Sequence, residues 1–352
     1  MLRINISGSG CPDQVTLYTI CYNLRFIYYG GMIAMAHGKD IKIISGNSNK
    51  PFAENVCRNL GLRLCRTDVT TFSDGEISVS LHETVRGSDV FIIQSTSYPI
   101  NDHLMETLIM VDACKRASAS RITAVMPYFG YARQDRKTKS RDPISAKLVA
   151  NLIASAGADR VLTMDLHAAQ IQGFFDIPVD NLVGSPLFVE YYNKKINGNA
   201  DDVVVVSPDI GSVGRARAFA MRMGLSLAII DKRREKANQA EVVNIIGSVE
   251  GKRIILFDDM VDTAGSLCGA AKALAELGGA KEVYACASHG VLSGKAIDLI
   301  DESNIEELVF TDTIPYRGEK QSAKIKYLSA APLFAEAIKR IFEEVSISVL
   351  FR

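Results

Sequence analysis

The chain has 352 residues, a length that fits about two domains. Hydrophobic residues make up 47% and charged residues 23%, a globular composition that argues against extended disorder. Lysine and arginine together number 40, and so do aspartate and glutamate, so no overall positive field exists to attract nucleic acid or an anionic membrane. We therefore expect neither a nucleic-acid nor a membrane partner, and any polyanion must be bound by a local group of side chains.

The seven cysteines are scattered, with no C-x-x-C pair and no zinc-finger spacing. This usage is typical of reduced thiols in a reducing compartment, and we expect a cytoplasmic protein. The longest uncharged apolar stretch, residues 26–36, is much shorter than the roughly 20 residues of a membrane-spanning helix.

Residues 1–40 differ from the rest of the chain, with Asp13 as the one acidic residue before Asp40. Arg25, the apolar run after it and Ala34-Met35-Ala36 superficially resemble the end of a secretory signal, but the polar and apolar parts are in poor order. We expect a disordered extension, or a segment left untranslated because translation starts at Met32 or Met35.

From Ile41 onward, short apolar runs alternate with helical patterns. The runs are continuous rather than alternating, as expected for strands covered on both faces. In the helical stretches 102–117, 144–156, 213–223 and 264–277, apolar residues recur three and four apart, with glycines at several ends. The candidate strands are Ile41–Ser45, Val90–Gln94, Ile122–Met126, Val161–Met164, Val203–Val206, Leu227–Ile230, Ile254–Phe257, Val283–Ala287 and Leu308–Phe310.

This alternation predicts an α/β fold with parallel sheets. Because nine strands are many for one open sheet, we predict two consecutive α/β domains, each a mainly parallel sheet flanked by helices. The boundary is placed near Asn181–Ser185. The predicted units are the extension 1–40, an N-terminal domain 41–183, a C-terminal domain 184–340 and a tail 341–352.

Polar residues follow strand after strand, at the sheet edge where open parallel sheets bind ligands. The most specific such segment runs from Asp258 to Ser266. Its small-residue turn, Thr263-Ala264-Gly265-Ser266, is expected to open a helix near Leu267 and to cradle a phosphate with backbone N–H groups. Asp258, Asp259 and Asp262 lie beside this turn, where carboxylates can accept hydrogen bonds from sugar hydroxyls. The pattern predicts a phosphorylated-sugar site, whereas the simpler alternative is an ordinary strand end with a helix cap.

No Walker-type phosphate loop occurs, and no G-x-G-x-x-G follows a strand, so any nucleotide is bound in another way. The segment 258–266 resembles the phosphoribosyl-pyrophosphate loop of type I phosphoribosyltransferases. With four further segments, this loop is similar to the ribose-phosphate pyrophosphokinase (PRPP synthetase) family of the common bacterial and animal class: Phe72–Glu76, Tyr131–Asp135, Asp165–Gly173 and Asp231–Arg234. The resemblance implies that the two consecutive α/β domains are of the phosphoribosyltransferase type.

The resemblance implies transfer of the β,γ-diphosphoryl group of MgATP to the C1 hydroxyl of ribose 5-phosphate, which yields phosphoribosyl pyrophosphate (PRPP) and AMP. It also implies that Lys232 is an essential cation on a flexible loop and that Arg234 contacts the sugar-phosphate side. A closing loop with two cations could stabilise charge on the transferred group.

For ATP, the resemblance implies contacts from Arg133 and Gln134. It further implies that His167 and Asp209 ligate the Mg²⁺ bound to ATP. Physical chemistry alone would favour a transition metal at a histidine, because Mg²⁺ prefers oxygen ligands. We keep Mg²⁺ because the family resemblance implies it.

The resemblance also implies a homohexamer whose ATP site is shared, with the adenine contacts Phe72, Asp74, Gly75 and Glu76 coming from a neighbouring subunit. It implies a regulatory site where inorganic phosphate activates and ADP inhibits. The residues matched to that site are Thr84, Arg86, Arg141, Gln172, Asp180, Ser346 and Ser348.

The chain departs from the family pattern at three positions: Ser212 replaces a usual glycine, Glu235 a usual proline and Ser266 a usual threonine. None of these changes removes a predicted ligand. Two alternatives remain: a nucleobase phosphoribosyltransferase, which would need only the loop, and a non-catalytic regulatory subunit, which would typically have a damaged catalytic loop.

Overall fold

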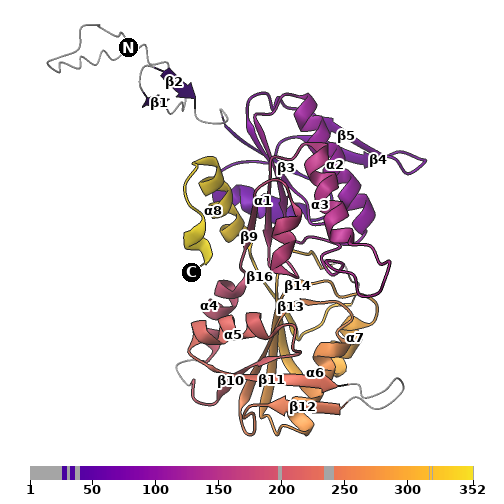
Figure 1. Ribbon diagram of the computed structural model, residues 1–352, viewed down its shortest axis with the longest axis vertical. Helices are drawn as coiled ribbons and strands as arrows, with labels where there is room; N and C mark the ends of the chain where they lie inside the picture. The colour runs from indigo at the N-terminus through magenta and orange to yellow at the C-terminus, as the bar shows by residue number, and fades with distance from the viewer. Residues whose placement is uncertain are drawn as a thin grey trace, which may run out of the picture.

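The computed structural model describes residues 26–29, 32–35, 40–196, 200–233, 242–316, 318 and 320–351, without the side chains of 26–29, 32–35, 232–233, 242–243 and 351 (Figure 1). Most of the predicted extension 1–40 lies outside this description, apart from an antiparallel hairpin of β1 (Phe26–Tyr29) and β2 (Met32–Met35). None of the helices formed by the described residues combines the length and the hydropathy needed to cross a membrane.

The N-terminal sheet has five parallel strands in the order β3-β6-β7-β8-β9. Its strands are buried because α2 and α3 pack on one face and α1 packs on the other. A separate antiparallel hairpin, β4–β5, extends from this domain (Figure 1). The bounds are β3 (Ile41–Ser45), α1 (Lys50–Leu60), β4 (Thr67–Thr71), β5 (Ile77–Leu81), β6 (Asp89–Ile93), α2 (Ile100–Arg116), β7 (Arg121–Met126), α3 (Ser145–Ala156), β8 (Arg160–Met164), the 3-10 helix η1 (Ala169–Phe174) and β9 (Val179–Leu182).

The C-terminal sheet has seven strands in the order β12-β11-β10-β13-β14-β15-β16, all parallel to their neighbours except the β11–β12 pair. Helices α6 and α7 cover one face, and α4 and α5 cover the other. The bounds are α4 (Ser185–Ile196), β10 (Val203–Ser207), α5 (Val213–Met223), β11 (Ser226–Arg233), β12 (Val242–Ile246), β13 (Arg253–Val261), α6 (Gly265–Glu276), β14 (Glu282–Gly290), α7 (Ala296–Glu302), β15 (Ile305–Thr311), β16 (Ile325–Leu328), α8 (Ala331–Phe342) and the 3-10 helix η2 (Ser348–Phe351).

The fold class is as predicted, since both sheets are mainly parallel and flanked by helices. Each of the nine predicted strands overlaps an observed one, and the predicted helix ends at Gly157 and Gly224 are left-handed caps. The prediction missed β9, β12 and β16, which lie at sheet edges and contain polar residues, so they form no continuous apolar run. Helix α6 begins at Gly265 rather than near Leu267.

Helix α8 follows the last strand of the C-terminal sheet but packs on the N-terminal domain. It contacts α1, and its buried face joins the same core as β3 and β6 (Figure 1). The rings of Phe52 and Phe334 meet edge to face with their centroids 5.4 Å apart. Residues 331–342 therefore pack into the N-terminal core, whereas from the sequence 331–340 were assigned to the C-terminal domain and 341–342 to the tail.

We expect Phe334→Ala to lower the free energy of unfolding of the N-terminal domain by about 3–5 kcal/mol, because it removes a fully buried ring and leaves a cavity. Urea denaturation of the full chain measures this change. Phe72→Ala is the matched control, since that ring is 58% exposed and its loss should change stability by less than about 0.5 kcal/mol. A loss below about 1 kcal/mol for Phe334→Ala would contradict the proposed docking of α8.

Candidate active site

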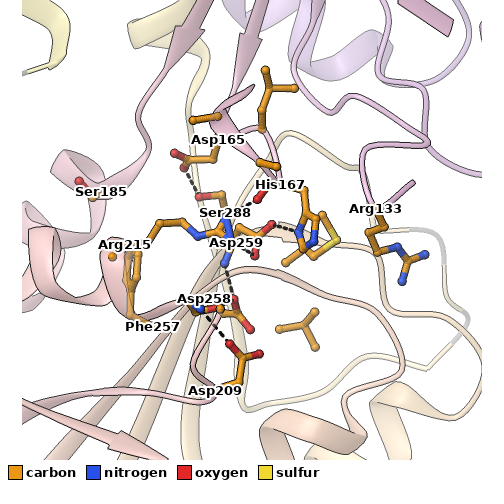
Figure 2. Close-up of a pocket in the computed structure, with 18 of the residues that line it drawn as sticks. Arg133, Asp165, His167, Ser185, Asp209, Arg215, Phe257, Asp258, Asp259 and Ser288 are labelled. Atoms are coloured by element: carbon orange, nitrogen blue, oxygen red, sulfur yellow. Dashed lines mark hydrogen bonds and ion pairs between the residues drawn. The ribbon is translucent and has the colours of Figure 1, made fainter. Parts of the chain in front are cut away.

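A cleft of about 1020 Å³ opens between the two sheets, at the carboxyl ends of their strands. The N-terminal domain contributes the segments after β7 and β8, and the C-terminal domain contributes the segments after β10 and β13 (Figure 2). Strand ends thus bring together residues that are far apart in sequence. The predicted site residues that line the cleft are Arg133, His167, Asp209, Asp258, Asp259, Asp262, Thr263, Ala264 and Ser266.

Asp259 joins the two domains at the centre of this cleft. One of its carboxylate oxygens lies 2.8 Å from Nδ1 of His167, and the other lies 3.2 Å from Nη2 of Arg215. Arg215 also donates from Nη1 to the backbone oxygen of His167 at 3.1 Å. Because Asp259 is only 3% exposed, these two partners compensate a carboxylate that burial would otherwise destabilise. The geometry holds the His167 ring with its Nε2 atom left for a ligand.

The two adjacent acids, Asp258 and Asp259, have opposite pKa shifts. Burial, reinforced by the neighbouring charge of Asp259, raises the pKa of Asp258 to about 7. Burial also acts to raise the pKa of Asp259, but the hydrogen bond to His167 and the charge of Arg215 outweigh it, so the pKa is lowered. The hydrogen bond to Asp259 in turn raises the pKa of His167. Near neutral pH Asp259 is therefore ionised, whereas Asp258 exchanges its proton readily.

Asp209 lies at the end of β10, on the opposite side of Asp258 from His167 (Figure 2). Its Oδ1 accepts a hydrogen bond from the backbone N–H of Ser212 at 2.8 Å. A side chain at Gly211 would place its Cβ 3.2 Å from this oxygen, so the glycine leaves room for the carboxylate. The Asp209 side chain is exposed and faces the cleft.

The donor set at this end of the cleft fits a Mg²⁺ ion that arrives with a phosphate ligand. His167 Nε2 and the Asp209 carboxylate would supply two protein ligands, and within the described ranges no group of three or more metal-binding side chains is preformed. Mg²⁺ commonly takes only one or two protein ligands and completes its shell with water and substrate phosphates.

The loop after β13 has the backbone geometry expected of an anion site. Ala264 has a left-handed backbone with φ of +63°, which turns the chain directly into the first residue of α6, Gly265. Thr263, Ala264 and Ser266 line the cleft beside that helix N-terminus. The first N–H groups of a helix have no partner inside the helix and carry a partial positive charge, so the loop suits a phosphate.

Arg133 and Asp262 connect the two sides of the cleft mouth. Nη1 of Arg133 donates to Asp262 Oδ2 at 2.5 Å, between segments that follow β7 and β13. Arg133, a predicted ATP contact, is thus paired with Asp262, a predicted ribose 5-phosphate contact. Gln134, the other predicted ATP contact, does not line the cleft, and its side chain accepts a hydrogen bond from Ser145 at 2.5 Å.

The predicted adenine contacts Phe72, Asp74, Gly75 and Glu76 lie in the turn between β4 and β5. Gly75 has a φ of +97°, which ends the strand geometry there. Phe72 is 58% exposed, and none of the four lines the cleft of its own chain.

The remaining predicted residues lie elsewhere. Arg234 and the side chain of Lys232 fall outside the described residues, and only the backbone of Lys232 is placed, paired with Val243 in the β11–β12 ladder. Within the described part of the chain, no hydrogen bond or ion pair joins the five segments predicted to form the regulatory site. Those segments carry Thr84 with Arg86, Arg141, Gln172, Asp180, and Ser346 with Ser348.

Among the cleft residues that were not predicted as site residues from the sequence are Arg215, Asp165 and Ser288. Arg215 occupies the first turn of α5, where the helix dipole disfavours a cation, and this conflict is a signal of a specific acidic partner. Asp165 is shielded in the domain junction, where its Oδ2 accepts hydrogen bonds from Ser288 Oγ and from the backbone of Gly184. Burial raises the pKa of Asp165.

Comparisons with known proteins cover almost the whole described region. A profile for the N-terminal domain of ribose phosphate pyrophosphokinase matches residues 41–157, and one for the phosphoribosyl synthetase-associated domain matches residues 233–352. The ribose-phosphate pyrophosphokinase of Caldanaerobacter subterraneus subsp. tengcongensis is 62% identical over 88% of this chain and 98% of its own length. That of Clostridium tetani is 59% identical over 91% and 100%. The crystal structure of phosphoribosylpyrophosphate synthetase from Mycobacterium smegmatis superposes with a TM-score of 0.82 and 43% identity, covering 87% of this chain and all of the other.

Proposed function

The chain belongs to the ribose-phosphate pyrophosphokinase family and has its activity, the production of PRPP, and from this premise we propose how its own residues carry out the reaction. The enzyme transfers the β,γ-diphosphoryl group of ATP to the C1 hydroxyl of ribose 5-phosphate and releases AMP. The observation that carries our assignment of roles is the single cleft in which a helix N-terminus, a pair of acids and a histidine from the other domain meet.

Ribose 5-phosphate binds at the loop after β13. Its phosphate lies against the N-terminus of α6, within reach of Thr263, Ala264, Gly265 and Ser266. Its ring hydroxyls donate to carboxylates of the acidic segment that precedes the loop, which consists of Asp258, Asp259 and Asp262. Anchoring the sugar at both ends orients the C1 hydroxyl toward the nucleotide, and such orientation supplies much of the rate enhancement in phosphoryl transfer.

ATP binds on the N-terminal side of the same cleft. Arg133 exchanges its contact with Asp262 for the nucleotide phosphates, and Gln134 adds a contact once its segment moves toward the cleft. His167 Nε2 and the Asp209 carboxylate would hold the Mg²⁺ that the family generally uses, and the ion would supply positive charge to the transferred group. The C1 hydroxyl oxygen forms a bond to the β-phosphorus as the bond from that phosphorus to the oxygen shared with the α-phosphate breaks, so AMP leaves with that oxygen.

Lys232 and Arg234 supply the remaining positive charge. We assign Lys232 to the transferred group, where charge changes most between ground state and transition state, and Arg234 to the sugar-phosphate side. The support is the family pattern Asp231-Lys232-Arg233-Arg234 and its place at the end of β11, beside the strand that carries Asp209.

The ATP site is shared between subunits of a homo-oligomer, which we propose is a hexamer. The turn between β4 and β5 does not line the cleft of its own chain, and the Phe72 ring in this turn is exposed. Aromatic side chains are commonly buried where proteins meet, so an exposed ring suits a contact with another subunit. Phe72 then stacks on the adenine bound by a neighbouring subunit. Asp74, Gly75 and Glu76 complete that pocket.

This arrangement predicts complementation between two defective chains. Phe72→Ala should raise the KM for ATP, and Lys232→Ala should be inactive, yet a mixed oligomer contains some sites with one intact copy of each group. We expect co-refolded or co-expressed mixtures to regain part of the AMP formation that the separate variants lack. Mixing Lys232→Ala with Asp259→Asn is the control, because both changes fall in the same chain's half of the site. No gain over the separate variants would refute the shared site.

We further propose that inorganic phosphate activates and ADP inhibits through the regulatory residues, namely Thr84, Arg86, Arg141, Gln172, Asp180, Ser346 and Ser348. Six of the seven are exposed and Asp180 is half-buried, and their positions on separate segments are compatible with a site assembled between subunits. We also propose a cytoplasmic enzyme, since the five cysteines among the described residues are all unpaired.

The direct test incubates the purified protein with MgATP and ribose 5-phosphate and follows AMP and PRPP, with and without inorganic phosphate. We expect PRPP and AMP to form in equal amounts and to increase with phosphate. Supplying a nucleobase with PRPP in place of ATP tests the transferase alternative. A lack of turnover by the intact chain alone, with activity appearing on addition of a catalytic homologue, would instead identify a regulatory subunit.

A further inference from the structure

Ser212 is the N-cap residue of α5, yet its hydroxyl does not cap the helix. Serine at this position usually accepts a hydrogen bond from an N–H of the first turn. Here the side chain makes no capping bond and donates instead to Asp258 Oδ1 at 2.7 Å. The residue is only 3% exposed, so water does not compete effectively for this hydrogen bond.

The same residue holds a second carboxylate through its backbone. The N–H of Ser212 donates to Asp209 Oδ1 at 2.8 Å, so one residue links the segment after β10 to the segment at the end of β13. Asp258 Oδ1 also accepts the backbone N–H of Asp259 at 2.9 Å. Two donors on one oxygen fix the rotation of the Asp258 carboxylate about its side-chain bond.

We propose that Ser212 is a positioning residue for ribose 5-phosphate, whose hydroxyl fixes the Asp258 carboxylate in the orientation that accepts the sugar hydroxyls. This inference rests on the proposed role of Asp258 in sugar binding. Glycine, which the family pattern leads one to expect at 212, offers no hydroxyl, so the device is a feature of this chain's own sequence. The backbone bond to Asp209 is available to any residue at 212, and the side-chain bond to Asp258 is what serine adds.

The position of Ser212 also predicts which substrate is affected. Asp258 belongs to the sugar side of the cleft, whereas Asp209 keeps its backbone donor when only the hydroxyl is removed. Loss of the hydroxyl should therefore weaken ribose 5-phosphate binding and leave ATP binding unchanged. A merely structural role for Ser212 would change thermal stability, or both KM values together.

The test compares Ser212→Ala and Ser212→Gly with the intact chain in steady-state assays of AMP formation. We expect both variants to raise the KM for ribose 5-phosphate about tenfold, the usual effect of losing a hydrogen bond to a charged group. The KM for ATP should stay within about twofold. Ser212→Thr should restore the original KM because it keeps the hydroxyl. Ser303→Ala is the matched control, since that hydroxyl bonds the backbone at the end of α7 and lies outside the cleft.

A double-mutant cycle with Asp258→Asn separates this proposal from the assignment of the sugar site. If Asp258→Asn raises the KM for ribose 5-phosphate and adding Ser212→Ala changes it no further, the hydroxyl acts through Asp258. If Asp258→Asn leaves that KM unchanged, the proposed role of Asp258 is wrong. If Asp258→Asn has its effect but both Ser212→Ala and Ser212→Gly bind the sugar normally, the positioning role is overturned. The same holds if Ser212→Gly is normal and only Ser212→Ala is impaired, because the hydroxyl is absent from both.

Discussion

Lys232→Ala is expected to lower the rate of AMP formation by about a thousandfold or more, the range found when a single cation that stabilises a transferred phosphoryl group is removed. The effect should fall on kcat, because the cation interacts with charge that redistributes only as the diphosphoryl group moves. ATP should still bind with nearly unchanged affinity. Steady-state assays of AMP formation and calorimetric titration with MgATP measure the two quantities separately.

The neighbouring cation provides the matched control for this experiment. Arg233→Ala removes one positive charge from the same end of β11, so it reproduces any general loss of attraction for anions, but it carries no proposed role. We expect it to retain turnover within about tenfold of the intact enzyme. Equal losses for Arg233→Ala and Lys232→Ala would mean that the segment acts by net charge alone. Unchanged turnover of Lys232→Ala would remove the assigned transition-state role altogether.

The strands that were predicted from the sequence are those whose residues are apolar for one physical reason, burial on both faces of the sheet. A run such as Val203–Val206 is apolar on both faces because helices cover both sides of a parallel sheet, and it is buried throughout in the structure. Strand β16 was missed because it is an edge strand whose middle residues, Lys326 and Tyr327, are exposed. Its sequence therefore contains no continuous apolar run. The docking of α8 onto α1 was missed as well, because an amphipathic helix indicates that it has a core-facing side but not which core it joins.

The candidate site was likewise predicted only in part from the sequence. Residues such as Asp258 and Thr263 are contiguous and have a chemical pattern that can be interpreted without a structure. Contacts between distant segments cannot be read in this way. His167 and Asp259 are 92 positions apart, and their hydrogen bond depends on how the two domains meet. Arg215 was overlooked because, in sequence, it looks like an ordinary surface residue of an amphipathic helix.

Asp259→Asn is expected to combine a large loss of activity with a measurable loss of stability. The change removes the charge that faces both His167 and Arg215, so the histidine loses its orientation and the partly buried guanidinium loses its counter-ion. We expect kcat/KM for ribose 5-phosphate to fall by about a hundredfold to a thousandfold, the range for losing an essential group that orients other site residues. The free energy of unfolding should fall by about 2 kcal/mol, less than for a fully buried pair because Arg215 is 29% exposed.

Two further variants show whether these losses come from the network around Asp259 or from the lost charge alone. Asp258→Asn removes one negative charge from the adjacent position and leaves the contacts of Asp259 with His167 and Arg215 in place, so it should impair sugar binding without the same loss of stability. Adding Arg215→Met to Asp259→Asn removes the uncompensated guanidinium, and we expect stability to recover while activity does not. Denaturation curves and assays on the same four proteins measure both quantities. If Asp258→Asn and Asp259→Asn proved equally destabilising, or if activity returned with Arg215→Met, Asp259 would not be the residue that joins the two halves of the site. Of the two adjacent acids, it is Asp259 that has partners in both domains.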